Sequence, residues 1–219
     1  MAHEDLLAAT EFFAGVGREQ LSEFEKRGSV RMLIRGDVLF DEGALPEELF
    51  VVISGRIAIA SRAIDGRESV FALMEAGDLL GEMGLLDGLP RSAEARALES
   101  SQVLAIPYQP VRTVFEAEPR LLWGVVRLLV GRLRTTDEAL ADSVFLDVTG
   151  RTAKRLLELA GGADEFLLPV TQEELAGMVG ASRERVNKAI ASFIRLGWIE
   201  QHDRRYRIVQ RDRLTMRAR

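Results

Sequence analysis

Cysteine is absent from this chain of 219 residues, and only two histidines, His3 and His202, are present. Without cysteine the chain cannot form disulfides, thiolate zinc sites or cysteine-ligated iron-sulfur clusters. Two histidines leave almost nothing from which to build a haem or another metal site. We therefore expect no metal, no haem and no iron-sulfur cluster, and the lack of cysteine is typical of the reducing cytoplasm.

Long apolar runs are also missing. None approaches the roughly 20 residues that cross a bilayer, and the N-terminus lacks the charged and then apolar layout of a signal peptide. The sequence therefore predicts a soluble, cytoplasmic protein that does not contact membranes. Its length suffices for one large domain or two modest ones, with a core that needs no covalent cross-links.

The net charge of −5 conceals a difference between the two ends. Residues 151–219 carry 14 basic and 9 acidic side chains, a net charge of +5, whereas residues 1–150 carry a net charge of −10. Attraction to phosphates is local, because salt screens charges beyond about 10 Å. Only the C-terminal part is therefore expected to meet a polyanion, and the boundary falls near Asp147.

The stretch from Pro119 to Val144 is predicted to be one long helix. Apolar or small side chains recur there at alternating steps of four and three, namely Leu122, Val126, Leu129, Leu133, Thr136, Leu140 and Ser143. Such a heptad seam is typical of a parallel helical dimer. The alternative is an amphipathic helix lying on its own domain. The hydroxyl of Thr136 on this apolar seam could fix the register of the two helices or contact a polar group. The alternative is a local hydrogen bond from the hydroxyl to a backbone carbonyl of the preceding turn.

The N-terminal part is predicted to combine short helices with a β-rich body. Residues 5–27 have near-helical apolar spacing, and from Val30 the period changes to short strands at 31–34, 38–40, 49–53, 57–60, 70–74 and 103–106. Glycine turns, including Ser54-Gly55, Asp65-Gly66 and Gly77-Asp78, separate these runs. The pattern indicates an antiparallel sandwich or roll, whose interior is a natural place for a small ligand.

The segment from Gly81 to Ala93 interrupts this strand rhythm. Gly81 and Gly84 leave the backbone bare, a helical turn follows at 85–86, and Arg91 and Ser92 add a guanidinium and a hydroxyl. Helix-end amides, a guanidinium and a hydroxyl can together bind a phosphate. Glu82 is a suitable acceptor for a sugar hydroxyl beside it. The alternative is an exposed Arg91 paired with Asp87.

The C-terminal region has the pattern of a winged helix-turn-helix. Asp147 is placed to cap a helix that ends at Gly161-Gly162, Thr171 and Glu174 form a capping box, and Ser182 caps a further helix after a glycine turn. The helix after Ser182 is expected to bury Val186, Ala189, Ile190, Phe193, Ile194 and Leu196, and to expose Arg183, Glu184, Arg185, Asn187 and Lys188. Two strands around 198–200 and 205–209 would form the wing. The alternative is an ordinary helical hairpin.

The cassette Gly81-Glu82 followed by Arg91-Ser92-Ala93 resembles the phosphate-binding cassette of cyclic nucleotide-binding domains. The glycine-spaced roll, the long helix, the segment Phe145–Arg151 and the C-terminal region resemble the bacterial cyclic AMP receptor protein (CRP/FNR) family, so the likeness covers nearly the whole chain. The stretch Thr171–Lys188 looks closest to actinobacterial members. The resemblance implies an α+β fold with a cyclic nucleotide-binding β-roll at 1–118, a dimerisation helix and hinge at 119–146, and a winged helix-turn-helix at 147–219.

The resemblance also implies the roles of individual residues. Glu82 would bind the ribose 2′-hydroxyl of cyclic AMP and Arg91 with Ser92 the cyclic phosphate, helped by backbone around Gly81 and Ala93. The adenine would meet Thr136 of one subunit and Asp137 of the other, where the family has serine or asparagine. Aspartate accepts hydrogen bonds but cannot donate them, so base identity stays open. For DNA, base contacts fall to Arg183, Glu184 and Lys188, phosphate contacts to Thr171 and Ser182, and Arg185 and Asn187 depart from the best-known member.

The resemblance thus implies a homodimeric transcription regulator whose affinity for a near-palindromic DNA site is controlled by cyclic AMP, and RNA polymerase is an expected partner. Alternatives are a constitutive DNA binder and a regulator of the same fold with another effector. A cyclic nucleotide domain that regulates an enzyme is disfavoured, because the residues beyond the hinge already form a helix-turn-helix. The sequence has no nucleophile with a matching base, so we expect no enzyme activity.

Overall fold

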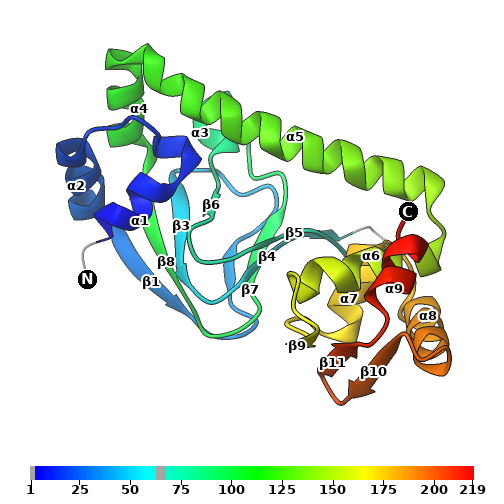
Figure 1. Ribbon diagram of the computed structural model, residues 1–219. Coiled ribbons are helices and arrows are strands. Elements are labelled where there is room, and N and C mark those ends of the chain that lie inside the picture. Colours follow the sequence, from blue (N-terminus) through cyan, green and yellow to red (C-terminus); the bar gives the residue numbers. More distant parts are fainter. Residues whose placement is uncertain (1–2, 63–67) are drawn as a thin grey trace. The chain divides into compact units, whose positions relative to one another are not determined.

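The β-rich runs of the N-terminal part form two sheets in the computed structural model, which describes residues 3–62 and 68–219 (Figure 1). The first sheet has the order β1-β8-β3-β6, and its pairs are antiparallel. The second has the order β2-β7-β4-β5. The bounds are β1 (Ser29–Leu33), β2 (Val38–Phe40), β3 (Glu48–Ser54), β4 (Ile57–Arg62), β5 (Glu68–Met74), β6 (Leu79–Leu80), β7 (Glu94–Ala97) and β8 (Ser101–Pro107). The predicted roll is confirmed, while the turn at Asp65-Gly66 lies outside the described residues.

Helices cover the outer face of the first sheet. They are α1 (Glu4–Ala9), η1 (Glu11–Phe13), α2 (Arg18–Arg27), α4 (Tyr108–Ala117) and η2 (Pro119–Leu121), and a short α3 (Met83–Asp87) follows β6. Side chains alternate across a strand, and β3 therefore serves two cores. Leu49 and Val51 pack with the helices, whereas Phe50 and Val52 pack between the two sheets.

The predicted long helix is α5 (Leu122–Phe145). Gly124 and Val125 are buried against the N-terminal core, while the five aliphatic seam residues from Leu122 to Leu140 are between 38% and 63% exposed. A Cβ at Gly124 would lie 2.5 Å from the carbonyl oxygen of Glu11, so only glycine permits this approach. One face of α5 thus lies on its own domain, and the heptad seam on another face stays uncovered in the single chain.

The chain divides into two compact units, of which the first comprises residues 1–61 and 71–134 and the second residues 62–70 and 135–219, so that one boundary lies within α5. The second unit contains α6 (Val148–Ala160), β9 (Glu165–Leu167), α7 (Gln172–Val179), α8 (Arg183–Arg195), β10 (Ile199–His202), β11 (Arg205–Ile208) and α9 (Arg211–Arg217). Its sheet has the order β10-β11-β9. The β10-β11 hairpin is the predicted wing.

Helix ends in the second unit follow the capping signals of the sequence. Asp147 accepts from the amide of Gly150 at the start of α6, and Gly161 ends that helix in the left-handed region at φ 56°. Thr171 and Glu174 form the predicted capping box on α7, and Ser182 accepts from the amide of Arg185. These caps satisfy amides that would otherwise lack partners at helix ends.

Several expectations for the fold require correction. Ile194 and Leu196, predicted to be inside, are 41% and 51% exposed, because they follow the last buried turn of α8. The elements α4, β6, β7, β9 and α9 were not predicted from the sequence. None of the helices in the described ranges is long and apolar enough to cross a membrane.

Candidate functional site

The predicted cassette residues converge on one cavity in the first unit. The cavity has a volume of about 80 Å³ and is lined by Phe40, Ile59, Met74, Leu80, Gly81, Glu82, Met83, Gly84, Pro90, Arg91, Ser92, Ala93 and Arg132. All five residues expected to bind the ribose and phosphate are among them. The strands supply an apolar wall, while the chain around α3 and Arg132 of α5 supply the polar groups.

Glu82 is the buried carboxylate of this cavity, with only 1% of its surface exposed. Its Oε1 accepts from Nη1 of Arg132, whereas Oε2 is buried and has no hydrogen-bond partner among the described residues. Burial raises the pKa of the Glu82 carboxyl, because the charged form is poorly solvated; the charges of Arg132 and Arg91 oppose that rise.

Arg91 is buried rather than exposed, and the expected alternative of a surface pair with Asp87 is wrong. The residue is 8% exposed, and its guanidinium lies 4.3 Å from the centroid of the Phe40 ring. Nη1 donates to the carbonyl oxygen of Gly81 at 2.8 Å, and Nη2 to that of Glu48 at 2.6 Å. Nε is buried and lacks a partner within the described part of the chain.

The two unpartnered atoms define what the cavity can bind. A buried polar atom without a hydrogen bond is costly, so each such atom is a candidate for a ligand contact. Glu82 Oε2 can accept from a hydroxyl, and Arg91 Nε can donate to an anionic oxygen. The donor and acceptor set therefore fits a ligand that carries a hydroxyl and an acidic group, such as a sugar phosphate.

Arg132 is a site residue that the sequence analysis did not identify. It reaches from α5 into the cavity, where its guanidinium donates to Glu82 and to the carbonyl oxygen of Leu79. At about 80 Å³ the cavity is smaller than typical ligand pockets of roughly 300 Å³ and above. The cavity would therefore have to widen to hold a nucleotide. Arg132 precedes Thr136 by four residues in the predicted long helix, and this spacing could have placed it on the same side of the helix from sequence alone.

Glu82→Gln is expected to raise the melting temperature of the ligand-free protein at about pH 7. The native carboxyl holds its proton to a higher pH than the unfolded one, because its pKa is raised. The free energy of unfolding therefore falls as the pH rises from the ordinary carboxyl pKa through the raised value. Glutamine does not titrate and its amide oxygen still accepts from Arg132, so the gain should shrink towards pH 4. Calorimetric scans at pH 7 and pH 4 measure the change in melting temperature. An equal gain at the two pH values would contradict a raised pKa of Glu82.

Thr136 and Asp137 are exposed on α5. They belong to the second unit, whereas the cassette belongs to the first. Their contact with an adenine therefore stays a prediction, as does the assignment of these two positions to different subunits.

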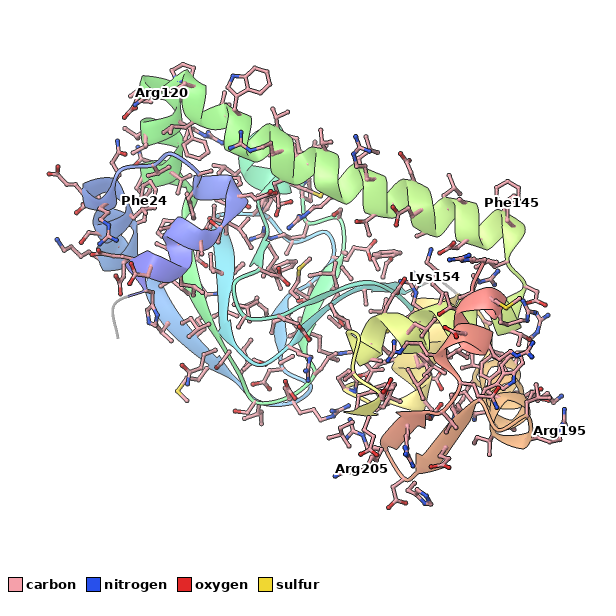
Figure 2. All side chains as sticks on the ribbon, viewed as in Figure 1. Phe24, Arg120, Phe145, Lys154, Arg195 and Arg205 are labelled. Atoms are coloured by element: carbon pink, nitrogen blue, oxygen red, sulfur yellow. The ribbon has the colours of Figure 1, made fainter. Side chains whose placement is uncertain are left out.

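Six of the seven expected DNA-binding residues lie at the start of α8 in the second unit, and Thr171 is exposed at the N-cap of α7. Ser182, Arg183, Glu184, Arg185, Asn187 and Lys188 are exposed on α8, while Val186, Ala189, Ile190 and Phe193 are buried beneath them. Arg185 and Lys188 border a hollow of about 270 Å³ shared with Val148 and Thr149 at the start of α6. Figure 2 shows the long cationic side chains around α8 and the wing, with Arg195 at the far end of α8 and Arg205 on β11.

Glu184 and Lys188 form an ion pair of 2.7 Å one helical turn apart on this surface. The hydrogen bond from Lys188 lowers the pKa of the Glu184 carboxyl. Both side chains are 75% exposed, so the pair contributes little to stability but holds two polar ends side by side. A helix with such an outer face suits the edges of bases in a major groove.

The comparisons with known proteins identify the domain to which each candidate site belongs. Residues 30–118 match the cyclic nucleotide-binding domain, and residues 150–217 match the Crp-like helix-turn-helix domain. The CRP-like cAMP-activated global transcriptional regulator of Mycobacterium tuberculosis is 36% identical over 99% of this chain and 100% of its own length. The cAMP-activated global transcriptional regulator CRP of Escherichia coli is 33% identical over 69% of this chain and 76% of its own.

Solved structures show the same fold. The c-di-GMP-responsive global regulator CLP of Xanthomonas campestris is 25% identical with a TM-score of 0.77, covering 88% of this chain and 99% of that one. FixK2 from Bradyrhizobium japonicum, at 19% identity and a TM-score of 0.78, covers 86% and 96%. The mycobacterial relative agrees with the expected likeness to actinobacterial members. The chain belongs to the CRP/FNR family of transcription regulators, with a cyclic nucleotide-binding domain and a helix-turn-helix domain.

Proposed function

We propose that this regulator acts as a homodimer whose affinity for DNA is raised by cyclic AMP bound at the cassette cavity. Glu82 holds the ribose 2′-hydroxyl, and Arg91 and Ser92 hold the cyclic phosphate, with backbone help at Gly81 and Ala93. Thr136 and Asp137 of the two α5 helices contact the adenine. The regulator has no catalytic activity in this proposal, and it recruits RNA polymerase as its partner at promoters.

One observation carries the nucleotide assignment. Glu82 and Arg91 both line the same small cavity, and each has a buried polar atom without a hydrogen-bond partner among the described residues. A cyclic nucleotide offers a hydroxyl for the first and a phosphate for the second, so both would be satisfied by a single ligand. The mycobacterial and enterobacterial relatives named as cAMP-activated support cyclic AMP as that ligand.

The exposed seam of α5 supports the proposed dimer. Aliphatic side chains at heptad spacing remain uncovered in the single chain, and a second parallel copy of the helix would bury them. Two protomers then present two α8 helices, which can enter successive major grooves about 34 Å apart on a near-palindromic site. Cyclic AMP would favour the arrangement in which both helices point the same way, a shift between two populated states.

Titration calorimetry with cyclic AMP, cyclic GMP and c-di-GMP tests this proposal, on the unchanged chain and on Arg91→Ala. We expect cyclic AMP to bind in the micromolar range, and the substitution to weaken binding at least tenfold, because charge-assisted hydrogen bonds to the phosphate are lost. The melting temperature of the variant must be measured alongside, since Arg91 is buried. If titration with each of the three nucleotides gives no heat of binding, the proposed effector is wrong.

DNA binding with and without nucleotide separates the proposal from its main alternative. Equal affinity for operator DNA in both conditions would identify a constitutive binder, whereas tighter binding only with cyclic GMP or c-di-GMP would identify another effector. Asp137 is the residue most relevant to this choice, because its carboxylate can accept from an adenine amino group but donates nothing to the base.

A further inference from the structure

Tyr108 contacts the guanidinium of Arg91 through a hydrogen bond. It is the first residue of α4, is 8% exposed and does not line the cavity itself. Its hydroxyl accepts from Nη1 of Arg91 at 2.9 Å and donates to the carbonyl oxygen of Gly81. Nη1 of Arg91 also donates to that carbonyl, so the three groups form a closed triangle.

Within the described residues, the hydrogen-bond acceptors around the Arg91 guanidinium are all neutral. They are the carbonyl oxygens of Gly81 and Glu48 and the hydroxyl of Tyr108. A carboxylate in their place would neutralise the guanidinium and compete with a phosphate for it. Burial raises the pKa of the Tyr108 hydroxyl despite the nearby charge of Arg91, so this group stays protonated and uncharged at neutral pH. The neutral acceptors thus hold the Arg91 guanidinium in place, and its positive charge remains available to a phosphate.

The cassette glycines make room for this arrangement. Gly81 has a positive φ of 85°, and a Cβ there would lie 2.6 Å from Nη1 of Arg91. A Cβ at Gly84 would lie 2.5 Å from the ring of Pro46 and 3.1 Å from the hydroxyl of Tyr108. The spacing of two glycines in the cassette is therefore explained by the close packing of Arg91 and Tyr108 as well as by bare backbone towards a ligand.

We propose that Tyr108 is a positioning residue for nucleotide binding: its hydroxyl fixes the Arg91 guanidinium against the Gly81 carbonyl, in the orientation that aims Nε at the phosphate. This inference rests on the proposed function, because it needs the phosphate to bind at Arg91. Of the three acceptors around Arg91, only the hydroxyl of Tyr108 belongs to a side chain, so only it can be removed by a simple substitution.

Tyr108→Phe keeps the ring in the helix-side core and removes only the hydroxyl. We expect cyclic AMP to bind about fivefold to tenfold more weakly, as for the loss of one typical hydrogen bond. The factor lost when 2′-deoxy cyclic AMP replaces cyclic AMP should be the same in the variant and the unchanged chain, because the Glu82 half of the site is intact. A general loosening of the pocket would change that factor as well.

A double-mutant cycle shows whether Tyr108 acts through Arg91. In the Arg91→Ala background, adding Tyr108→Phe should cause no further loss of affinity. The matched control is Tyr206→Phe, which removes the only other tyrosine hydroxyl of the chain. That hydroxyl accepts a hydrogen bond from Gln172 in the second unit, and its loss should leave the nucleotide affinity unchanged.

Fluorine NMR of the chain labelled with 3-fluorotyrosine gives an independent readout. The two tyrosines give two resonances, assigned with the two phenylalanine variants, and saturating cyclic AMP should shift the one from Tyr108. An unmoved resonance would overturn the role of Tyr108 even if Tyr108→Phe failed to fold. Affinity of Tyr108→Phe equal to that of the unchanged chain, or losses that simply add to those of Arg91→Ala, would overturn it too. Each of these results overturns only the role of Tyr108, because the unchanged chain still binds cyclic AMP. If the unchanged chain binds no cyclic nucleotide, the proposed function is overturned along with this inference.

Discussion

Leu133→Asp is expected to convert the dimer into monomers and to weaken binding to a palindromic site by about three orders of magnitude. Leu133 is 59% exposed in the middle of the α5 seam, where a parallel partner would place the same residue opposite it. The substitution removes apolar burial and brings two carboxylates together in a poorly solvated place. A monomer then binds only one half-site. It loses the second, linked contact, which raises the affinity of a dimer for the whole site by a factor of about 10² to 10⁴.

Sedimentation equilibrium measures the first effect and gel-shift titration the second. Ala141→Asp is the matched control, because Ala141 is also exposed on α5 but lies off the heptad positions. This control should remain dimeric and bind the same site normally. A Leu133→Asp variant that still sediments as a dimer would show that the interface lies elsewhere. Such a result would remove the basis for the two-helix docking on DNA.

The elements that could be predicted from sequence were those with a strong local signal. Glycine turns separate the β-strands, and the caps at Asp147, Thr171 and Ser182 mark helix starts that depend only on nearby residues. The missed elements have no such signal. In β7 the inward residues are the small Ala95 and Ala97, which fill space between the sheets beside Phe50 rather than forming an apolar run. Alanine has little strand propensity, so the tertiary packing decided this strand.

The cassette could be located from the sequence, but Tyr108 and Arg132, which contact its side chains, could not. Glu82, Arg91 and Ser92 lie within one short segment whose spacing indicates anion binding. Tyr108 and Arg132 reach the same place from α4 and α5, so their contacts depend on how those helices pack on the first sheet. Arg91 is buried because it has three acceptors within the protein, two of which, from Glu48 and Tyr108, lie far from it in the sequence. Those contacts could not be read from the sequence, so an exposed arginine was a reasonable alternative. Long-range hydrogen bonds of this kind leave no periodic trace in a sequence.

Arg183→Ala is expected to weaken binding to the specific DNA site by a hundredfold or more. Arg183 is the first residue of α8, exposed next to the Ser182 cap, where a guanidinium can donate two hydrogen bonds to one guanine. Each such contact contributes about 1 to 3 kcal/mol of discrimination, and a dimer loses two of them. Sequence preference at the contacted base pair should relax at the same time.

Gel-shift or fluorescence-anisotropy titration against the operator and against operators changed at single base pairs measures both effects. Arg195→Ala is the matched control, since it removes the same charge from the last turn of the same helix, at the end away from the expected base contacts. The control should lower affinity for all sequences by a similar small factor, through phosphate attraction alone. Equal losses in the two variants, with sequence preference unchanged, would mean that Arg183 contacts the backbone and that another residue of α8 contacts the base.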